Sequence, residues 1–281
     1  MSPSLQDDKI APTAHYTAYV WHRLGFPNAE LFVTPLGRSL FWSFRFAGEG
    51  LLTWAPFAPS MTQYLAYRHR AVESVVESER PDLVVELGAG LSRRGVTWAS
   101  RGVPYVEVDL PHMVAAKVAM LAERSDDGLR SALRGRLEHR SIDILSPDFS
   151  NELKQLLGDA KRPLVLSEGV LTYFSKPDRE RLLRSVAEAL DGRGAFVGEI
   201  RVRQKSAAAA TVKVLRAGIR LVTRGRGSGE DLPSHEAARQ SFLDAGFDQV
   251  DAIDAARWPD LAGVPHPAWV WVSRGWVRGD A

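Results

Sequence analysis

The chain has 281 residues, a formal net charge of +2 and no cysteine. Apolar residues make up 45% and charged residues 25% of it, an ordinary composition for a globular protein with a full core. The nearly neutral charge gives no reason to expect a nucleic-acid partner, and the lack of cysteine excludes disulfides, thiolate chemistry and cysteine-ligated metal centres. The polar, acidic start is unlike a secretory signal, and no uncharged apolar stretch of about 18 residues predicts a membrane span. We therefore expect a cytoplasmic protein that binds no metal; the sequence indicates no oligomeric state.

The first sixty residues are expected to form a helical cap. Residues 13–57 are unusually aromatic, and Pro27, Pro35 and Pro56 divide them into short pieces that predict two or three helices. Aromatic side chains at helical spacing usually pack a core, and the same segment can also close over a flat or apolar ligand. Both roles are compatible, because a cap needs packing of its own.

A helix is predicted over residues 61–78, with Arg68 and Arg70 near its middle. A charged pair on a helix is commonly a solvated face. Alternatively, one of the two arginines points over the turn that follows the strand predicted at residues 83–87 and holds the carboxylate of a ligand there. The sequence leaves both readings open.

Residues 83–90, LVVELGAG, are the segment around which the fold is organised. The branched apolar residues predict a strand buried on both faces, as in the centre of a parallel sheet. Gly88 and Gly90 then allow a tight turn and a close backbone approach, and Ser92 is a candidate N-cap for the helix that follows. A strand, a glycine turn and a helix often place a nucleotide-like ligand at the carboxyl edge of an open α/β sheet, although the pattern also occurs as a purely structural connection.

The next part of the chain alternates strands and helices, which is typical of a doubly wound sheet. Strands are predicted at residues 104–108, 137–142, 164–167 and 195–200. A helix is predicted at 111–124, where Val114, Val118 and Leu121 are expected to face the core. Ser175 is expected to cap the next long helix.

The last third of the chain completes the expected fold. Residues 201–226 are basic and alanine-rich, and about 201–233 are expected to form a helical lid inserted into the domain. Its basic face is either solvated or able to meet an acidic carrier domain or a membrane surface. Two final strands are predicted at 246–253 and 268–273, the second antiparallel. The predicted fold is therefore a seven-stranded, mostly parallel α/β sheet in a domain at 61–281, with the cap at 1–60.

Four acidic residues occupy equivalent positions. Glu86, Asp109, Asp143 and Glu168 each stand at the carboxyl end of one of four successive predicted strands, and an open α/β sheet binds its ligand along that edge. Asp109 comes 21 residues after Gly88, about the spacing of an acid that binds a ribose diol. A rim of carboxylates disfavours a phosphate-rich cofactor and favours a cationic one. S-adenosylmethionine, with its sulfonium and amino groups, is such a ligand.

Four segments carry a resemblance to a known family: ELGAGLSRRG, YVEVDLP, HRSIDIL and LSEGVLTYF. Together they resemble the leucine carboxyl methyltransferase family, including its bacterial members that act as O-methyltransferases in polyketide and other secondary metabolism. The resemblance covers residues 13–200. It implies a Rossmann-like class I methyltransferase fold and a methyl transfer from S-adenosylmethionine, with S-adenosylhomocysteine as product. The acceptor would be a carboxylate or hydroxyl of a small metabolite.

The resemblance also implies roles for individual residues. Asp109 would hold the ribose hydroxyls, Asp143 the adenine amino group, and Glu168 the amino group of the cofactor. Tyr173 falls where the family places an aromatic residue near the acceptor. Taking the resemblance and the strand-end acids together, the predicted cofactor-binding residues are Arg68 or Arg70, Glu86, Gly88, Ala89, Gly90, Asp109, Leu110, Asp143, Ile144 and Glu168.

A carboxylate acceptor needs no general base, whereas a phenol or alcohol would use one. The candidate bases are His15, His22, His69 and His235. We take His22, together with Tyr173, as the catalytic candidates. One alternative is a nicotinamide-dependent oxidoreductase of similar fold, against which Arg93 argues because it replaces the third glycine of the dinucleotide fingerprint. Another is a protein-modifying or non-catalytic family member that grips a partner with its aromatic cap.

Overall fold

The computed structural model describes residues 11–46, 60–203, 231–254, 257–258 and 268–274. Most of the expected lid, and the part of the aromatic segment that includes Pro56, lie outside the described residues. Among the described helices, none combines the length and the apolar character that a membrane-spanning segment requires.

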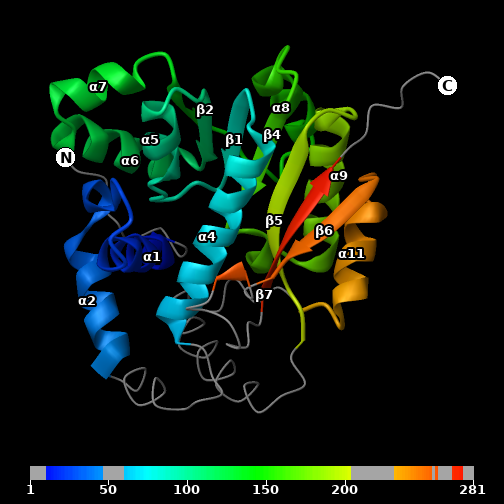
Figure 1. Ribbon diagram of the computed structural model, residues 1–281, viewed down its shortest axis with the longest axis horizontal. Helices are drawn as coiled ribbons and strands as arrows, with labels where there is room; N and C mark the ends of the chain where they lie inside the picture. The colour runs from blue at the N-terminus through cyan, green and yellow to red at the C-terminus, as the bar shows by residue number, and fades with distance from the viewer. Residues whose placement is uncertain (1–10, 47–59, 204–230, 255–256, 259–267, 275–281) are drawn as a thin grey trace.

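A seven-stranded sheet forms the middle of the molecule, in the order β3-β2-β1-β4-β5-β7-β6 (Figure 1). The strands are β1 (Leu83–Leu87), β2 (Tyr105–Asp109), β3 (Leu137–Ser141), β4 (Pro163–Ser167), β5 (Ala195–Arg201), β6 (Gln249–Ile253) and β7 (Ala268–Arg274). The pairs among β1 to β5 are parallel, and β7 runs antiparallel to both β5 and β6. This arrangement confirms the predicted mostly parallel sheet with an antiparallel last strand.

Helices cover both faces of the sheet. They are α1 (Ala11–Arg23), α2 (Pro35–Phe44), α4 (Met61–Glu79), α5 (Arg94–Ser100), α6 (Pro111–Arg124), α7 (Asp127–Leu133), α8 (Phe149–Leu157), α9 (Lys176–Leu190) and α11 (His235–Leu243), with short 3-10 helices η1 (Ala29–Phe32) and η3 (Leu171–Tyr173). Successive strand residues point to opposite faces, so Val84 packs in a core with α4, α5 and α6, whereas Val85 packs in a second core with α8, α9 and α11.

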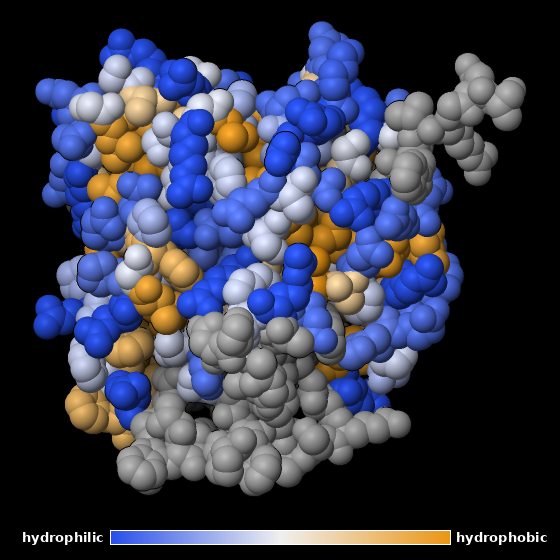
Figure 2. Space-filling model, in the orientation of Figure 1, coloured by the Kyte–Doolittle hydropathy of each residue, from blue (hydrophilic) through white to orange (hydrophobic). Residues whose placement is uncertain are grey.

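The cap consists of α1, η1 and α2, in line with the prediction of two or three helices. It has a small core of its own, in which Tyr16, Tyr19 and Phe41 pack together. Leu36, in the first turn of α2, is 38% exposed. Phe46, just after the other end of α2, is 82% exposed, and Figure 2 shows an apolar area over that end of the helix, at the lower left. The apolar surface thus lies where the chain continues into residues outside the described ranges.

Two predictions of local structure are wrong. Helix α6 buries Met113, Lys117 and Leu121, while Val118 stays 43% exposed. The helix is rotated because the Lys117 ammonium lies 2.7 Å from a carboxylate oxygen of Glu107 in β2, and a buried charge needs such a partner. The N-cap of α5 is Arg93 and not Ser92. The α7 and α8 helices were not predicted.

Candidate functional site

The turn after β1 brings the backbone close to its neighbours. Gly88 and Gly90 have φ values of +65° and +49°, in the left-handed region that favours glycine. A Cβ atom on Gly88 would lie 2.4 Å from Cγ2 of Val170. The amide N–H of Gly88 donates to the carbonyl of Val108 at 2.8 Å, and that of Gly90 donates to Oδ2 of Asp109 at 2.6 Å. The predicted tight turn and close approach are confirmed.

A pocket of about 300 Å³ opens beside this turn, at the carboxyl edge of the sheet. One wall is the glycine turn, another is the loop after β4 together with η3, and helix α1 of the cap covers them. Thr13, Thr17 and Trp21 face the pocket from α1, since residues four apart share one side of a helix. The hydroxyl of Tyr173 donates to Oγ1 of Thr13 at 3.2 Å and so links η3 to the cap.

Most of the predicted site residues meet in this pocket. Those that line it are Arg68, Gly88, Ala89, Gly90, Asp109, Leu110, Asp143, Ile144, Glu168 and Tyr173. They come from helix α4, from the ends of four strands and from η3, so residues far apart in the sequence converge on one space. Of the two arginines left open by the sequence, Arg68 lines the pocket and Arg70 does not.

The prediction that Glu86 faces the ligand cleft is wrong. Its side chain is buried inside the sheet–helix layer, where Oε1 lies 2.6 Å from Nη1 of Arg94 and Oε2 accepts a hydrogen bond of 2.7 Å from the Tyr105 hydroxyl. Glu86 belongs to β1 itself, so its direction is set by the pleat of the strand and the helix above it. Three of the four predicted carboxylates therefore line the pocket.

The prediction of His22 as a catalytic residue is also wrong in its placement. His22 is exposed on α1 and does not line the pocket, because it follows Trp21 and points to another side of the helix. His15 is buried with Nδ1 2.9 Å from Oγ1 of Thr34, and His235 is exposed on α11. His69 is buried beside Glu168 in a polar network and does not itself line the pocket.

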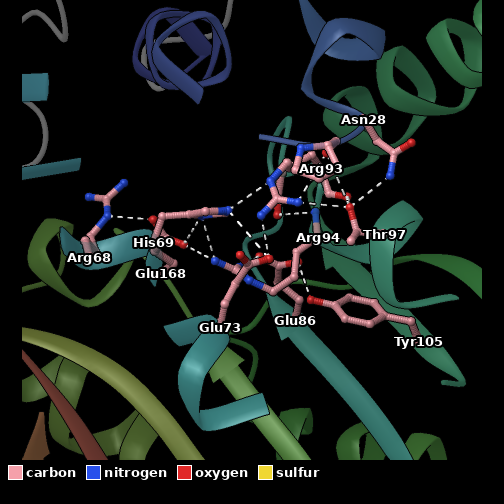
Figure 3. Close-up of polar contacts among 12 residues, drawn as sticks. Asn28, Arg68, His69, Glu73, Glu86, Arg93, Arg94, Thr97, Tyr105 and Glu168 are labelled. Carbon is pink, nitrogen blue, oxygen red and sulfur yellow. Dashed lines mark hydrogen bonds and ion pairs between the residues drawn. The ribbon is translucent and has the colours of Figure 1, made fainter. Parts of the chain in front are cut away.

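Figure 3 shows that network around Glu168. Oε1 of Glu168 accepts a hydrogen bond from Nε of Arg68 at 2.8 Å, and Oε2 contacts Nη2 of Arg94 and lies 3.1 Å from Nδ1 of His69. Burial opposes ionisation of Glu168, but the charges of Arg94 and Arg68 and the hydrogen bond with His69 outweigh it and hold the pKa of this carboxyl well below its usual range. Glu168 is thus ionised. Arg68 also lies 3.2 Å from Glu199.

Negative charge exceeds positive charge around the pocket. The charged side chains of the network are those of Arg68, Arg93, Arg94, Glu73, Glu86, Glu168 and Glu199, of which Glu73 is only partly buried. Burial and the nearby Arg94 lower the pKa of His69 to about 4, so this imidazole is neutral at pH 7. Among the residues that line the pocket, one guanidinium, that of Arg68, faces the three carboxylates of Asp109, Asp143 and Glu168. Among the described residues, the site therefore favours a cationic ligand over a polyphosphate.

The sequence profile of the leucine carboxyl methyltransferase family matches residues 27–187, more than half of the chain. The chain belongs to the leucine carboxyl methyltransferase family. The match includes the glycine turn, Asp109, Asp143, Glu168 and Tyr173. No relative was found among curated proteins.

Solved structures share the fold at low sequence identity. A candidate methyltransferase from Thermobifida fusca is 14% identical with a TM-score of 0.64, over 98% of this chain and 99% of that one. Human N-acetylserotonin methyltransferase in complex with S-adenosylmethionine is 12% identical with a TM-score of 0.50, over 96% and 68%. A candidate O-methyltransferase from Nostoc punctiforme is 16% identical with a TM-score of 0.50, over 76% of this chain, which spans 58% of that protein. These likenesses show the class I methyltransferase fold.

In this member of the leucine carboxyl methyltransferase family, several pocket residues escaped the sequence analysis. Thr13, Thr17 and Trp21 share one side of α1, and that spacing was a usable signal. His112 also lines the pocket, from the first turn of α6 three residues after Asp109. Within the described part of the chain, no group of three His, Asp or Glu side chains is arranged to hold a metal ion.

Proposed function

We propose that the chain is an S-adenosylmethionine-dependent O-methyltransferase that acts on a carboxylate or hydroxyl of a small metabolite, such as a polyketide or aromatic compound. The observation that carries the proposal is the convergence of the glycine turn with Asp109, Asp143 and Glu168 in one pocket. S-adenosylmethionine carries a positive sulfur and an ammonium group, which complement the excess of carboxylates. Membership of the leucine carboxyl methyltransferase family supports the same conclusion.

The residues at the turn fit the methionine part of this cofactor. Gly88, Ala89 and Gly90 present backbone to the pocket, and a side chain at Gly88 would collide with Val170. We assign this turn to the methionine chain. Arg68 has five N–H donors, so beside its contacts with the network it can also hold the cofactor carboxylate.

The nucleoside part fits the neighbouring edge of the pocket. Each oxygen of Asp109 accepts one backbone N–H, from Gly90 at 2.6 Å and from Leu110 at 2.7 Å, which leaves a lone pair on each oxygen for a ribose hydroxyl. Asp143 is exposed at the pocket edge and Ile144 lies beside it. We assign Asp143 to the adenine amino group and Ile144 to the ring face.

The acceptor is assigned to the space between the cap and η3. Trp21 and Thr17 bound it on one side and Tyr173 on the other, and the hydrogen bond from Tyr173 to Thr13 fixes the phenol ring across it. We assign residues 1–60 as a cap on the α/β domain at 61–281, and the described helices α1, η1 and α2 support this assignment. The proposed lid at about 201–233 lies mostly outside the described residues.

Alignment supplies most of the proposed rate enhancement. Bound S-adenosylmethionine supplies a methyl group on a positive sulfur. The glycine turn, Asp109 and Glu168 hold the donor side of the pocket, and the cap and Tyr173 hold the acceptor side. Positioning two reactants in this way contributes roughly 7–11 kcal/mol to lowering a barrier. The apolar surface of Trp21 keeps water from the acceptor side.

Calorimetric titration tests the proposal. The wild-type protein should bind S-adenosylhomocysteine with saturation and should not bind NAD. Asp109→Ala should abolish binding, whereas Asp127→Ala, which alters a side chain that is 99% exposed on α7, should leave it unchanged. Transfer of a tritiated methyl group to a panel of phenols and carboxylic acids would then identify the acceptor group. Binding of NAD without binding of S-adenosylhomocysteine would favour the oxidoreductase instead.

A further inference from the structure

His69 lies between the cap and Glu168, and each of its two ring nitrogens has a polar partner. Its side chain is fully buried on α4. Nε of Arg93 donates a hydrogen bond of 3.1 Å to Nε2 of His69. A guanidinium group has only donors, so this contact uses the lone pair of Nε2.

The proton of the neutral imidazole is therefore on Nδ1. Nδ1 lies 3.1 Å from Oε2 of Glu168, and the N–H donates to that carboxylate. The other tautomer would set an Nε2–H against the N–H of Arg93 and leave the contact with Glu168 without a proton. Nη2 of Arg94 also lies 2.9 Å from Nδ1. In the tautomer that we assign, Nη2 donates its N–H to Oε2 of Glu168 and not to Nδ1.

The contacts of Glu168 then divide between its two oxygens. Oε2 receives the N–H groups of His69 and Arg94, which uses both of its lone pairs. Oε1 receives Nε of Arg68 and keeps one lone pair. Since Glu168 lines the pocket, the remaining acceptor site on Oε1 is the one available to a ligand.

The same imidazole is packed against the cap. The ring centroid of His69 lies 4.6 Å from that of Trp21 and 4.9 Å from that of Phe26. Arg93, which fixes the tautomer, also donates to the carbonyl of Pro27 at 3.2 Å. Two explanations of His69 are therefore open: a ring that fills space under the cap, or a donor that orients Glu168.

We propose that His69 is a positioning residue whose Nδ1–H, fixed by Arg93, orients the Glu168 carboxylate toward the amino group of the cofactor. This inference rests on the proposed function, and it gives a role to a residue that does not itself touch the cofactor. Loss of that donor frees Oε2, so that the carboxylate can turn toward Arg94 and withdraw its acceptor from the pocket.

Two substitutions separate the donor role from the packing role. His69→Asn keeps an N–H near the position of Nδ1 but loses the aromatic ring. His69→Phe keeps a ring between Trp21 and Phe26 but has no donor. We expect His69→Asn to bind S-adenosylhomocysteine within about threefold of wild type, and His69→Phe to bind about tenfold more weakly or worse, as expected for a lost hydrogen bond to a charged group. A packing role predicts the opposite order.

A second measurement does not depend on the folding of a variant. The imidazole ¹⁵N chemical shifts of wild-type His69 should show a protonated Nδ1 and an unprotonated Nε2, with the signals assigned by their loss in His69→Asn. A proton on Nε2, or wild-type affinity in His69→Phe with weak binding in His69→Asn, would overturn this inference while the proposed function stands. Failure of the wild-type protein to bind S-adenosylhomocysteine would overturn the proposed function, and this inference with it.

Discussion

Arg94 is the cation on which the buried network depends most directly. Its side chain is 0% exposed, and it pairs with Glu86 at 2.6 Å and with Glu168. Methionine at this position would keep much of the volume but would leave two buried carboxylates without their shared cation. Removing one partner of a buried ion pair costs about 3–5 kcal/mol, against a total stability of about 5–15 kcal/mol. We therefore expect Arg94→Met to lower the free energy of unfolding by about 3–5 kcal/mol.

Urea unfolding at pH 7, followed by tryptophan fluorescence, measures this loss. The matched control is Arg140→Met, which removes an ion pair of 2.7 Å with Glu138 in which both side chains are about half exposed; it should cost less than about 1 kcal/mol. Adding Glu86→Gln to Arg94→Met should restore at least about 1 kcal/mol, because one uncompensated charge is removed. Equal losses in Arg94→Met and Arg140→Met, or no recovery in the double variant, would refute the reasoning.

Three further predictions follow from the site. Gly88→Ala should lower the free energy of unfolding by about 1–3 kcal/mol and abolish binding of S-adenosylhomocysteine, because the φ of Gly88 is +65° and the new methyl group meets Val170. The control Gly102→Ala, with φ of +95° and open space around the new methyl group, should keep wild-type affinity. Equal affinities of the two variants in calorimetry would contradict this. The pKa of His69 is lowered from 6.5 to about 4 in the folded protein, so as the pH falls the imidazole is protonated in the unfolded chain before it is protonated in the folded one. The stability that neutral His69 contributes, on the order of 3 kcal/mol, is complete above pH 6.5 and is lost as the pH falls to about 4. The free energy of unfolding in urea should therefore differ less between pH 5 and pH 7 for His69→Asn than for wild type. Equal differences in the two proteins would disprove this prediction. Glu168→Gln should remain folded but bind S-adenosylhomocysteine about tenfold more weakly or worse, since a neutral amide replaces the carboxylate; unchanged affinity in calorimetry would count against its role.

Much of the fold was predictable because its signals are local. Branched apolar strands, prolines in first helical turns and the two glycines after β1 act within a few residues, and the structure follows them. Asp109 was predictable for the same reason, since it ends β2 where a strand edge meets a turn. The convergence of Asp109, Asp143 and Glu168 followed from topology, because parallel strands end at one edge of a sheet.

The failures share a different cause, the pairing of buried charges across long distances. Glu86 was expected at the pocket, but its carboxylate pairs with Arg94 between the strand and the helix that covers it. Val118 was expected in the core, but the pair of Lys117 with Glu107 turns the helix instead. Hydropathy does not report which charges will find partners, so these residues were placed on the wrong side. An acid inside a strand, followed by two adjacent arginines, was a usable sign of such a pair.

A crystal structure of the protein with S-adenosylhomocysteine tests the central claim most directly, because it locates the ligand relative to the three pocket carboxylates. The account predicts the ribose hydroxyls on Asp109, the adenine amino group on Asp143, and the amino group on Oε1 of Glu168. Density for the ligand elsewhere, or in this pocket with its amino group turned away from Glu168, would contradict the account.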